Sequence, residues 1–305
     1  MDIALGTMWF GTSVSEEESF AILDRFVEAG GTMLDTANNY AFWLNGGVGG
    51  ESEEVLGRWL ASRPGMRDRI VLGTKVGAKP LAPGSGLENV EGLSSTAITS
   101  AAEDSLRRLQ TDHIDLYWAH YEDRSVPLED TMSGFGELVT SGKVGRIGVS
   151  NHPVWRVERA RTAGPVPYTD LQYRYSYLQP RPGVKLPEGG HYHVNEDLLG
   201  YARDAGLKLW AYTALLSGVY SGRPDRPLPE HYEHVGNTRR LAVLGEVADE
   251  LGATRNQVVL AWLMGGDPPI IPIVGVGKLA HLEEFLPAAE LRLDAELGER
   301  LDSAV

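Results

Sequence analysis

Short apolar runs alternate with amphipathic segments along the whole chain. The runs are apolar throughout, which is typical of parallel strands that are covered on both faces. We expect strands at 3–8, 32–36, 70–76, 114–120, 146–150, 168–173, 207–213 and 270–274. Helical periodicity predicts helices at 16–29, 51–62, 95–109, 128–141, 153–162, 195–205, 238–251, 254–264 and 278–286.

Eight such β–α units in 305 residues predict an α/β fold, a (β/α)8 TIM barrel with parallel strands. An open doubly wound sheet is the alternative. Its dinucleotide motif G-x-G-x-x-G does not follow an early strand, and the phosphate motif G-x-x-x-x-G-K-[ST] does not occur. No linker or internal repeat interrupts the pattern, so we expect a single domain over 1–305.

Composition narrows the class of partner. The formal net charge is −14, which argues against nucleic acid and anionic membranes as partners. There are no cysteines, so disulfides, thiolate nucleophiles and cysteine-based zinc sites are excluded. No secretory signal and no membrane-spanning run is expected. These features favour a soluble cytoplasmic protein.

Polar side chains stand where the predicted strands end, and in parallel barrels functional groups gather at these ends. Asp35 ends the second strand, Lys75 the third and His120 the fourth, while Tyr40 lies on the loop after Asp35. The fifth to seventh strands end in Ser150, Asn151, Gln172, Tyr212 and Thr213. We therefore expect these side chains to converge on one mouth of the barrel.

Each member of this set also has an ordinary explanation. Asp35 could be a loop or cap residue and Tyr40 a packing aromatic. Lys75 could lie across the barrel rim, and His120 could be a core histidine. Their convergence favours a site. A tyrosine phenol has a pKa near 10, and a neighbouring cation lowers that pKa. Lys75 can supply the cation, Asp35 can keep it charged, and His120 can hydrogen-bond the phenol or a substrate oxygen. The set predicts a tuned proton donor, which carbonyl reduction requires.

The motifs "LDTANNY", "GTK", "DLYWAH" and "GVSN" together resemble the aldo-keto reductase superfamily. The resemblance covers nearly the whole chain and implies a (β/α)8 barrel that reduces carbonyls with NADPH. It implies Tyr40 as general acid, Lys75 as its cation, Asp35 as the partner of Lys75, and His120 as the group that orients the carbonyl.

The resemblance also implies a dinucleotide site. Ser150, Asn151 and Gln172 would bind the nicotinamide carboxamide, and Tyr212 would stack on its ring. The run 213–218 would hold the pyrophosphate, and 275–285 the adenosine and its 2′-phosphate. Within these two runs the implied contacts are Thr213, Leu215, Ser217, Gly275, Lys278, His281 and Glu284.

The adenosine segment departs from the family pattern. Gly275 and Gly277 stand where a basic residue is usual, and Phe285 replaces a frequent asparagine. NADPH is the expected cofactor, and NADH stays open.

Aromatic residues are expected to surround the substrate: Trp9, Phe10, Phe42, Trp43, Tyr121 and Tyr177. They favour an apolar or ring-shaped aldehyde or ketone. Pocket shape depends on loops 41–50, 177–194 and 219–237, which the pattern leaves undefined. The "HYH" at 191–193 is a weak metal signal, and no metal site is expected.

Two other functions stay open at this point. The same barrel could bind NADP(H) and regulate a partner with negligible turnover. A lyase or aldolase could use Lys75 in a Schiff base, but that chemistry needs a neutral lysine and Asp35 favours the charged form.

Overall fold

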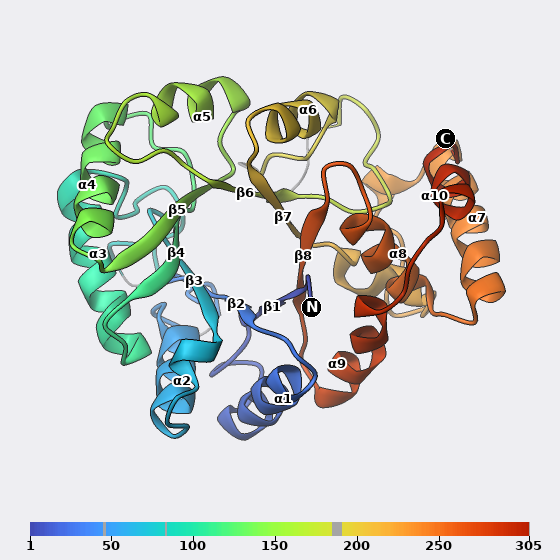
Figure 1. Cartoon of the computed structure of the whole chain (residues 1–305), viewed down its shortest axis with the longest axis horizontal. Coiled ribbons are helices and arrows are strands. Elements are labelled where there is room, and N and C mark those ends of the chain that lie inside the picture. The colour runs from blue at the N-terminus through green and yellow to red at the C-terminus, as the bar shows by residue number, and fades with distance from the viewer. Residues whose placement is uncertain (45–46, 83, 185–190, 305) are drawn as a thin grey trace.

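The structure, a computed structural model, describes residues 1–44, 47–82, 84–184 and 191–304. Its eight parallel strands close into a barrel, each pairing with the next and β8 with β1, which confirms the predicted (β/α)8 fold. Figure 1 shows the strands at the centre with helices around them. The strands are β1 (Ala4–Gly6), β2 (Met33–Asp35), β3 (Val71–Val76), β4 (Ile114–Ala119), β5 (Val144–Ser150), β6 (Asp170–Arg174), β7 (Lys208–Tyr212) and β8 (Ile270–Gly275).

The helices follow the predicted order, and no predicted bound is off by more than three residues. They are α1 (Glu16–Glu28), α2 (Glu51–Ala61), α3 (Ser95–Leu109), α4 (Leu128–Thr140), α5 (Val154–Arg161), α6 (Glu196–Asp204), α7 (Val235–Leu251), α8 (Arg255–Met264), α9 (Leu279–Phe285) and α10 (Ala295–Asp302). The sequence analysis missed α10. Asp294 caps that helix by accepting from the Leu297 amide, and Leu297 and Leu301 bury one face of it.

Local signals explain where helices begin. The Ser94 hydroxyl accepts from the Ala97 amide at the start of α3. Thr254 and Gln257 form a reciprocal capping box at the start of α8. Such caps satisfy amides that have no partner within the helix, so they fix the residue at which each helix begins.

Strand register places the polar strand ends over an apolar floor. Asp35 pairs with Gly6 and Gly73, and Lys75 pairs with Trp118. The Trp118 ring lies edge-on to Trp210, with centroids 5.7 Å apart. A Cβ on Gly73 would lie 3.1 Å from the Trp118 indole nitrogen, so glycine there leaves room for this large ring. The indoles fill the barrel below the polar ends, which therefore face its mouth.

The structure describes parts of the three loops whose conformation the sequence pattern left undefined. Residues 45–46 of the loop 41–50 and residues 185–190 of the loop 177–194 lie outside the described residues. The loop 219–237 includes the end of a 3-10 helix (Leu216–Ser221) and a second 3-10 helix (Glu230–Tyr232). In the described part of the chain, no helix has the length and apolar character needed to cross a membrane.

Candidate active site

A buried ion pair joins the ends of β2 and β3. The Lys75 ammonium lies 2.6 Å from Asp35 Oδ2, and the two side chains are 0% and 3% exposed. The same nitrogen donates to the Thr36 carbonyl at 2.7 Å and to the Tyr40 hydroxyl at 2.7 Å. An ammonium has three N–H donors, and these three acceptors use all of them. The geometry therefore favours the charged form of Lys75.

Tyr40 reaches this pair from the loop after β2. Its amide donates to the Ala37 carbonyl at 3.4 Å, and Ala41 has a φ of 68°, so the chain turns back over the mouth. The phenol accepts from Lys75 and donates to Asp35 Oδ2 at 3.3 Å. One carboxylate thus contacts both the ammonium and the phenol.

His120 completes the mouth corner, the name we use for Asp35, Tyr40, Lys75 and His120. It follows β4, and its ring centroid is 6.1 Å from that of Tyr40 at an interplanar angle of 76°. Its Nδ1 is buried and has no hydrogen-bond partner among the described residues. Both His120 and Tyr40 line the pocket at the mouth, so a polar ligand atom there would meet both rings.

The protonation pattern differs in one respect from the sequence expectation. Burial raises the pKa of the Tyr40 phenol well above its usual value, and the charge of Asp35 raises it further. The prediction of a lowered pKa was wrong because burial has the largest effect on the phenol, and the charge of the neighbouring Asp35 acts in the same direction. The phenol is therefore neutral, which is the form that can give up a proton.

The pKa values of the two basic groups of the corner, His120 and Lys75, shift downward. Burial, followed by the charge of Lys75, holds the pKa of the His120 imidazole well below its usual value. Burial also lowers the pKa of Lys75, and the charge of Asp35 opposes this effect. At neutral pH the imidazole is uncharged and can donate one hydrogen bond without adding a second cation.

A pocket of about 480 Å³ occupies the barrel mouth. Its wall contains four of the six aromatic residues that were expected to surround the substrate: Trp9, Phe42, Trp43 and Tyr121. The expectation was wrong for Phe10 and Tyr177, because both side chains are buried in the hydrophobic core. The Trp43 ring packs edge-on against both Trp9 and Phe42, with centroids 6.2 and 5.2 Å apart. Of the acidic residues, lysines and arginines, this lining contains Asp35 and Arg174. The wall suits a neutral, flat or apolar ligand.

Amide and hydroxyl groups line the opposite side of the pocket. Gln172 donates to Asp35 Oδ1 at 2.9 Å, and the Asn151 amide donates to the Ser150 hydroxyl at 2.9 Å. The Tyr212 hydroxyl donates to Asn151 Oδ1 at 2.7 Å. These four side chains come from β5, β6, β7 and the turn after β5. They provide the donors and acceptors that a carboxamide needs beside a flat ring, so they fit a nicotinamide.

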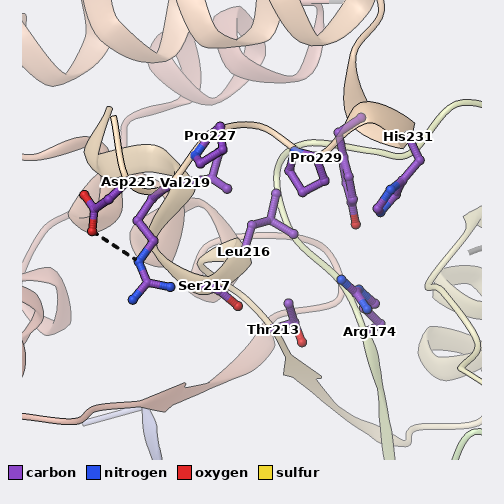
Figure 2. Close-up of a pocket in the computed structure, with 11 residues that line it drawn as sticks. Arg174, Thr213, Leu216, Ser217, Val219, Asp225, Pro227, Pro229 and His231 are labelled. Atoms are coloured by element: carbon purple, nitrogen blue, oxygen red, sulfur yellow. Dashed lines mark ion pairs between the residues drawn. The ribbon is translucent and has the colours of Figure 1, made fainter. Parts of the chain in front are cut away.

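A second pocket, of about 250 Å³, adjoins the first and shares Arg174, Thr213 and Ser217 with it. Figure 2 shows Thr213 at the end of β7, followed by the segment with Leu216, Ser217 and Val219, and a second pass of the chain with Pro227, Pro229 and His231. Thr213, Leu216 and Ser217 have φ values of 57°, 46° and 56°. Such strain in non-glycine residues is uncommon and concentrates at ligand sites.

The structure does not bring every expected cofactor residue to the mouth. Gly275 lines the mouth pocket, but Leu215, Lys278, His281 and Glu284 do not. Lys278 and His281 are exposed at the start of α9. The Glu284 carboxylate accepts from Asn256 at 2.8 Å and from Thr254 at 3.1 Å, so it ties α9 to α8.

Several residues at or behind the site were missed. Arg174, at the end of β6, lines both pockets, and its strand-end position could have identified it. His191 contacts the hydroxyls of Tyr212 at 2.6 Å and Tyr121 at 3.2 Å. These contacts place His191 of the "HYH" motif at the mouth, as expected for a loop that follows the sixth strand. Among the described residues, no group of three or more His, Cys, Asp or Glu side chains could hold a metal ion.

Two carboxylates behind the corner were also missed, the partly buried Glu91 and the fully buried Glu53. Glu91 accepts from the Asn38 amide at 2.8 Å and from the Gly77 amide at 2.7 Å, which ties the loop of Tyr40 to the loop after β3. Glu53 accepts from Thr74 at 2.6 Å and from Arg108 at 2.7 Å. Because Thr74 precedes Lys75, Glu53 fixes the strand that carries the ammonium. Neither residue stands at a strand end, so the pattern of strands and polar residues did not point to them.

Comparisons with known proteins agree with this architecture. A family model described as Aldo/keto reductase family matches residues 2–305. Norsolorinic acid reductase B of Aspergillus parasiticus is 32% identical, over 99% of this chain and 80% of that protein. An aryl-alcohol dehydrogenase (NADP+) of Phanerodontia chrysosporium is 29% identical, over 99% and 80%. A solved thermostable aldo-keto reductase in complex with the inhibitor epalrestat has a TM-score of 0.76 at 28% identity, over 100% and 95% of the two chains.

Proposed function

This chain belongs to the aldo/keto reductase family, and we propose that it reduces an aromatic or apolar aldehyde or ketone, with Tyr40 as the proton donor. Membership makes it an NAD(P)H-dependent oxidoreductase. The observation that carries the finer proposal is the contact of the Tyr40 hydroxyl with both Lys75 and Asp35 inside a pocket with an aromatic wall.

The residues of the mouth divide the work of such a reaction. The reduced nicotinamide, when bound, supplies a hydride to the carbonyl carbon. Ser150, Asn151, Gln172 and Tyr212 would hold the nicotinamide. Neutral His120 would donate a hydrogen bond to the carbonyl oxygen and so hold it beside the Tyr40 hydroxyl.

Proton transfer would follow from the contacts of the phenol. Tyr40 gives its proton to the oxygen as the carbon accepts the hydride, and the product is an alcohol. The phenolate left behind lies 2.7 Å from the Lys75 ammonium. Lys75 therefore stabilises the charge that develops during the reaction, even though burial keeps the resting phenol protonated.

The substrate class follows from the wall. Trp9, Phe42, Trp43 and Tyr121 present ring faces and edges, and in this lining only Arg174 offers a fixed positive charge. Aromatic carbonyls match this surface better than sugars or carboxylates would. The printed names of two relatives, norsolorinic acid reductase and aryl-alcohol dehydrogenase, support an aromatic substrate.

A direct test is to mix the protein with benzaldehyde, substituted benzaldehydes and short aliphatic aldehydes, each with NADH and with NADPH. We expect one alcohol to form for each dinucleotide oxidised, with higher kcat/KM for the aromatic series. If every carbonyl gave at most one turnover per protein molecule, the proposal of an enzyme would fail and a cofactor-binding regulatory role would replace it. A faster aliphatic series would contradict only the substrate class.

A further inference from the structure

The family resemblance implies that the adenosine of the dinucleotide would lie at the start of α9. We call residues 275–285, together with the first turn of α1, the adenosine end. The first amide of α9, that of Leu279, donates to Glu18 Oε1 at 2.7 Å. Glu18 belongs to a first turn of α1 that also holds Glu16 and Glu17. A carboxylate thus occupies the amide that an anionic ligand would otherwise approach.

Two arginines near this end are already paired with carboxylates, and a third packs against a neighbouring helix. Arg25 binds Glu283 through two contacts of 2.6 and 3.0 Å. Arg58 binds Glu16 at 2.7 Å. Arg255, at the start of α8, lays its guanidinium against Gly245 of α7.

Lys278 and His281 remain on the exposed surface of the adenosine end, without the bidentate geometry of an arginine. In addition, α9 is only seven residues long, so its dipole gives an anion little help.

We infer, on the basis of the proposed function, that this protein selects NADH against NADPH, and that Glu18 and the bare backbone at Gly277 set this preference. The two cofactors differ by one phosphate on the adenosine ribose. A carboxylate accepts a hydrogen bond from a free ribose hydroxyl, whereas a 2′-phosphate needs an arginine and is repelled by a carboxylate. The adenosine end contains such a carboxylate, that of Glu18, and contains no arginine. This composition disagrees with the expectation that NADPH is the cofactor.

The space at Gly277 makes the inference testable by substitution. A Cβ there would have Val14 Cγ2 as its nearest neighbour, at 4.0 Å, and the residue is exposed. Gly277 is not among the residues with positive φ, so a larger side chain can adopt its backbone conformation. An arginine at 277 would therefore fit and would add the missing guanidinium.

The first measurement is a calorimetric titration of the wild-type protein with NAD+ and with NADP+, which requires no turnover. We expect NAD+ to bind at least about tenfold tighter, the effect of one charge-assisted contact. Equal or tighter binding of NADP+ would overturn the inference and leave the proposed reductase intact. If neither NAD+ nor NADP+ bound, the proposed function itself would be contradicted.

Variants then assign the preference to residues. Gly277→Arg should raise the affinity for NADP+ relative to NAD+ by about tenfold. Glu18→Gln should raise it about fivefold, by removing the repulsion. Glu17→Gln is the matched control, since it removes an exposed neighbouring charge from the same turn. If Glu17→Gln changed the ratio as much as Glu18→Gln, the assignment to Glu18 would be wrong.

Discussion

The mouth corner and the adenosine end hold their charges in opposite ways. In the corner, Lys75 and Asp35 are buried, and their contacts are fixed by the register of adjacent strands. At the adenosine end, Lys278 and His281 are exposed on a loop and a short helix. Buried charges must be paired to be tolerated, whereas exposed ones are screened by water. We therefore expect substitutions in the corner to change both rate and stability, and substitutions at the adenosine end to change cofactor choice.

The sharpest contrast compares the same substitution in both regions. Lys75→Met removes the cation beside Tyr40, so kcat/KM should fall about 10³-fold or more. It also leaves Asp35 buried without its partner, so the free energy of unfolding should fall by about 3–5 kcal/mol. Lys278→Met removes an exposed charge and should change kcat by less than about twofold. Steady-state kinetics and urea denaturation check both variants.

Comparable losses of kcat in the two lysine variants would contradict the division between the regions. A Lys75→Met protein that is folded yet retains more than a tenth of wild-type kcat/KM would show that the ammonium is not needed for proton transfer.

A smaller effect is expected from the carboxylate behind the corner. Glu53→Gln breaks a buried pair with Arg108, so we expect a loss of about 3 kcal/mol in the free energy of unfolding and about a tenfold loss in kcat. Glu53 also raises the pKa of Lys75. Its replacement should therefore move the alkaline limb of the kcat profile to lower pH, which a purely structural role would not do.

Glu54→Gln is the matched control, because Glu54 is exposed and its partner Arg58 is exposed as well. It should change the free energy of unfolding by less than about 0.5 kcal/mol. If the alkaline limb of the kcat profile did not move in Glu53→Gln, the claim that Glu53 influences the charge of Lys75 would be contradicted.

The smallest effect concerns the pH dependence of the wild-type protein. The pKa of His120 lies well below its usual value, and that of Tyr40 well above. Neither group therefore changes its charge near neutrality, and kcat/KM for reduction should vary by less than about twofold between about pH 6 and 8. A fall in kcat/KM on acidification with a midpoint near 6.5, absent from His120→Gln, would show that His120 titrates there and would contradict its assignment as a neutral donor.

The two regions also differ in how far the sequence predicts them. Strand ends in a parallel barrel share one edge, so Asp35, Lys75 and His120 could be placed together from the order of apolar runs alone. Tyr40 could be added because it follows Asp35 by five residues. The direction of its pKa shift could not be predicted, because it depends on the competition between Asp35, Lys75 and burial at distances that only the fold provides.

Contacts between distant loops and helices left little trace in the sequence. Glu18 meets Leu279 across 261 positions of the chain. The positions of Glu91 and Glu53 behind the site could be recognised only from the hydrogen-bond partners that the fold brings to them. The helix α10 was missed, although its cap at Asp294 and the i, i+4 pair of Leu297 and Leu301 were a readable signal.

The central claim is that Tyr40 delivers the proton to the carbonyl oxygen. Rapid mixing of an aromatic aldehyde with protein that already holds reduced dinucleotide would give the single-turnover rate for wild type and for Tyr40→Phe, and a fluorescence titration would give their dinucleotide affinities. The account predicts a rate lowered by about 10²–10⁴-fold with an affinity changed by less than about twofold. A Tyr40→Phe rate within tenfold of wild type would contradict it.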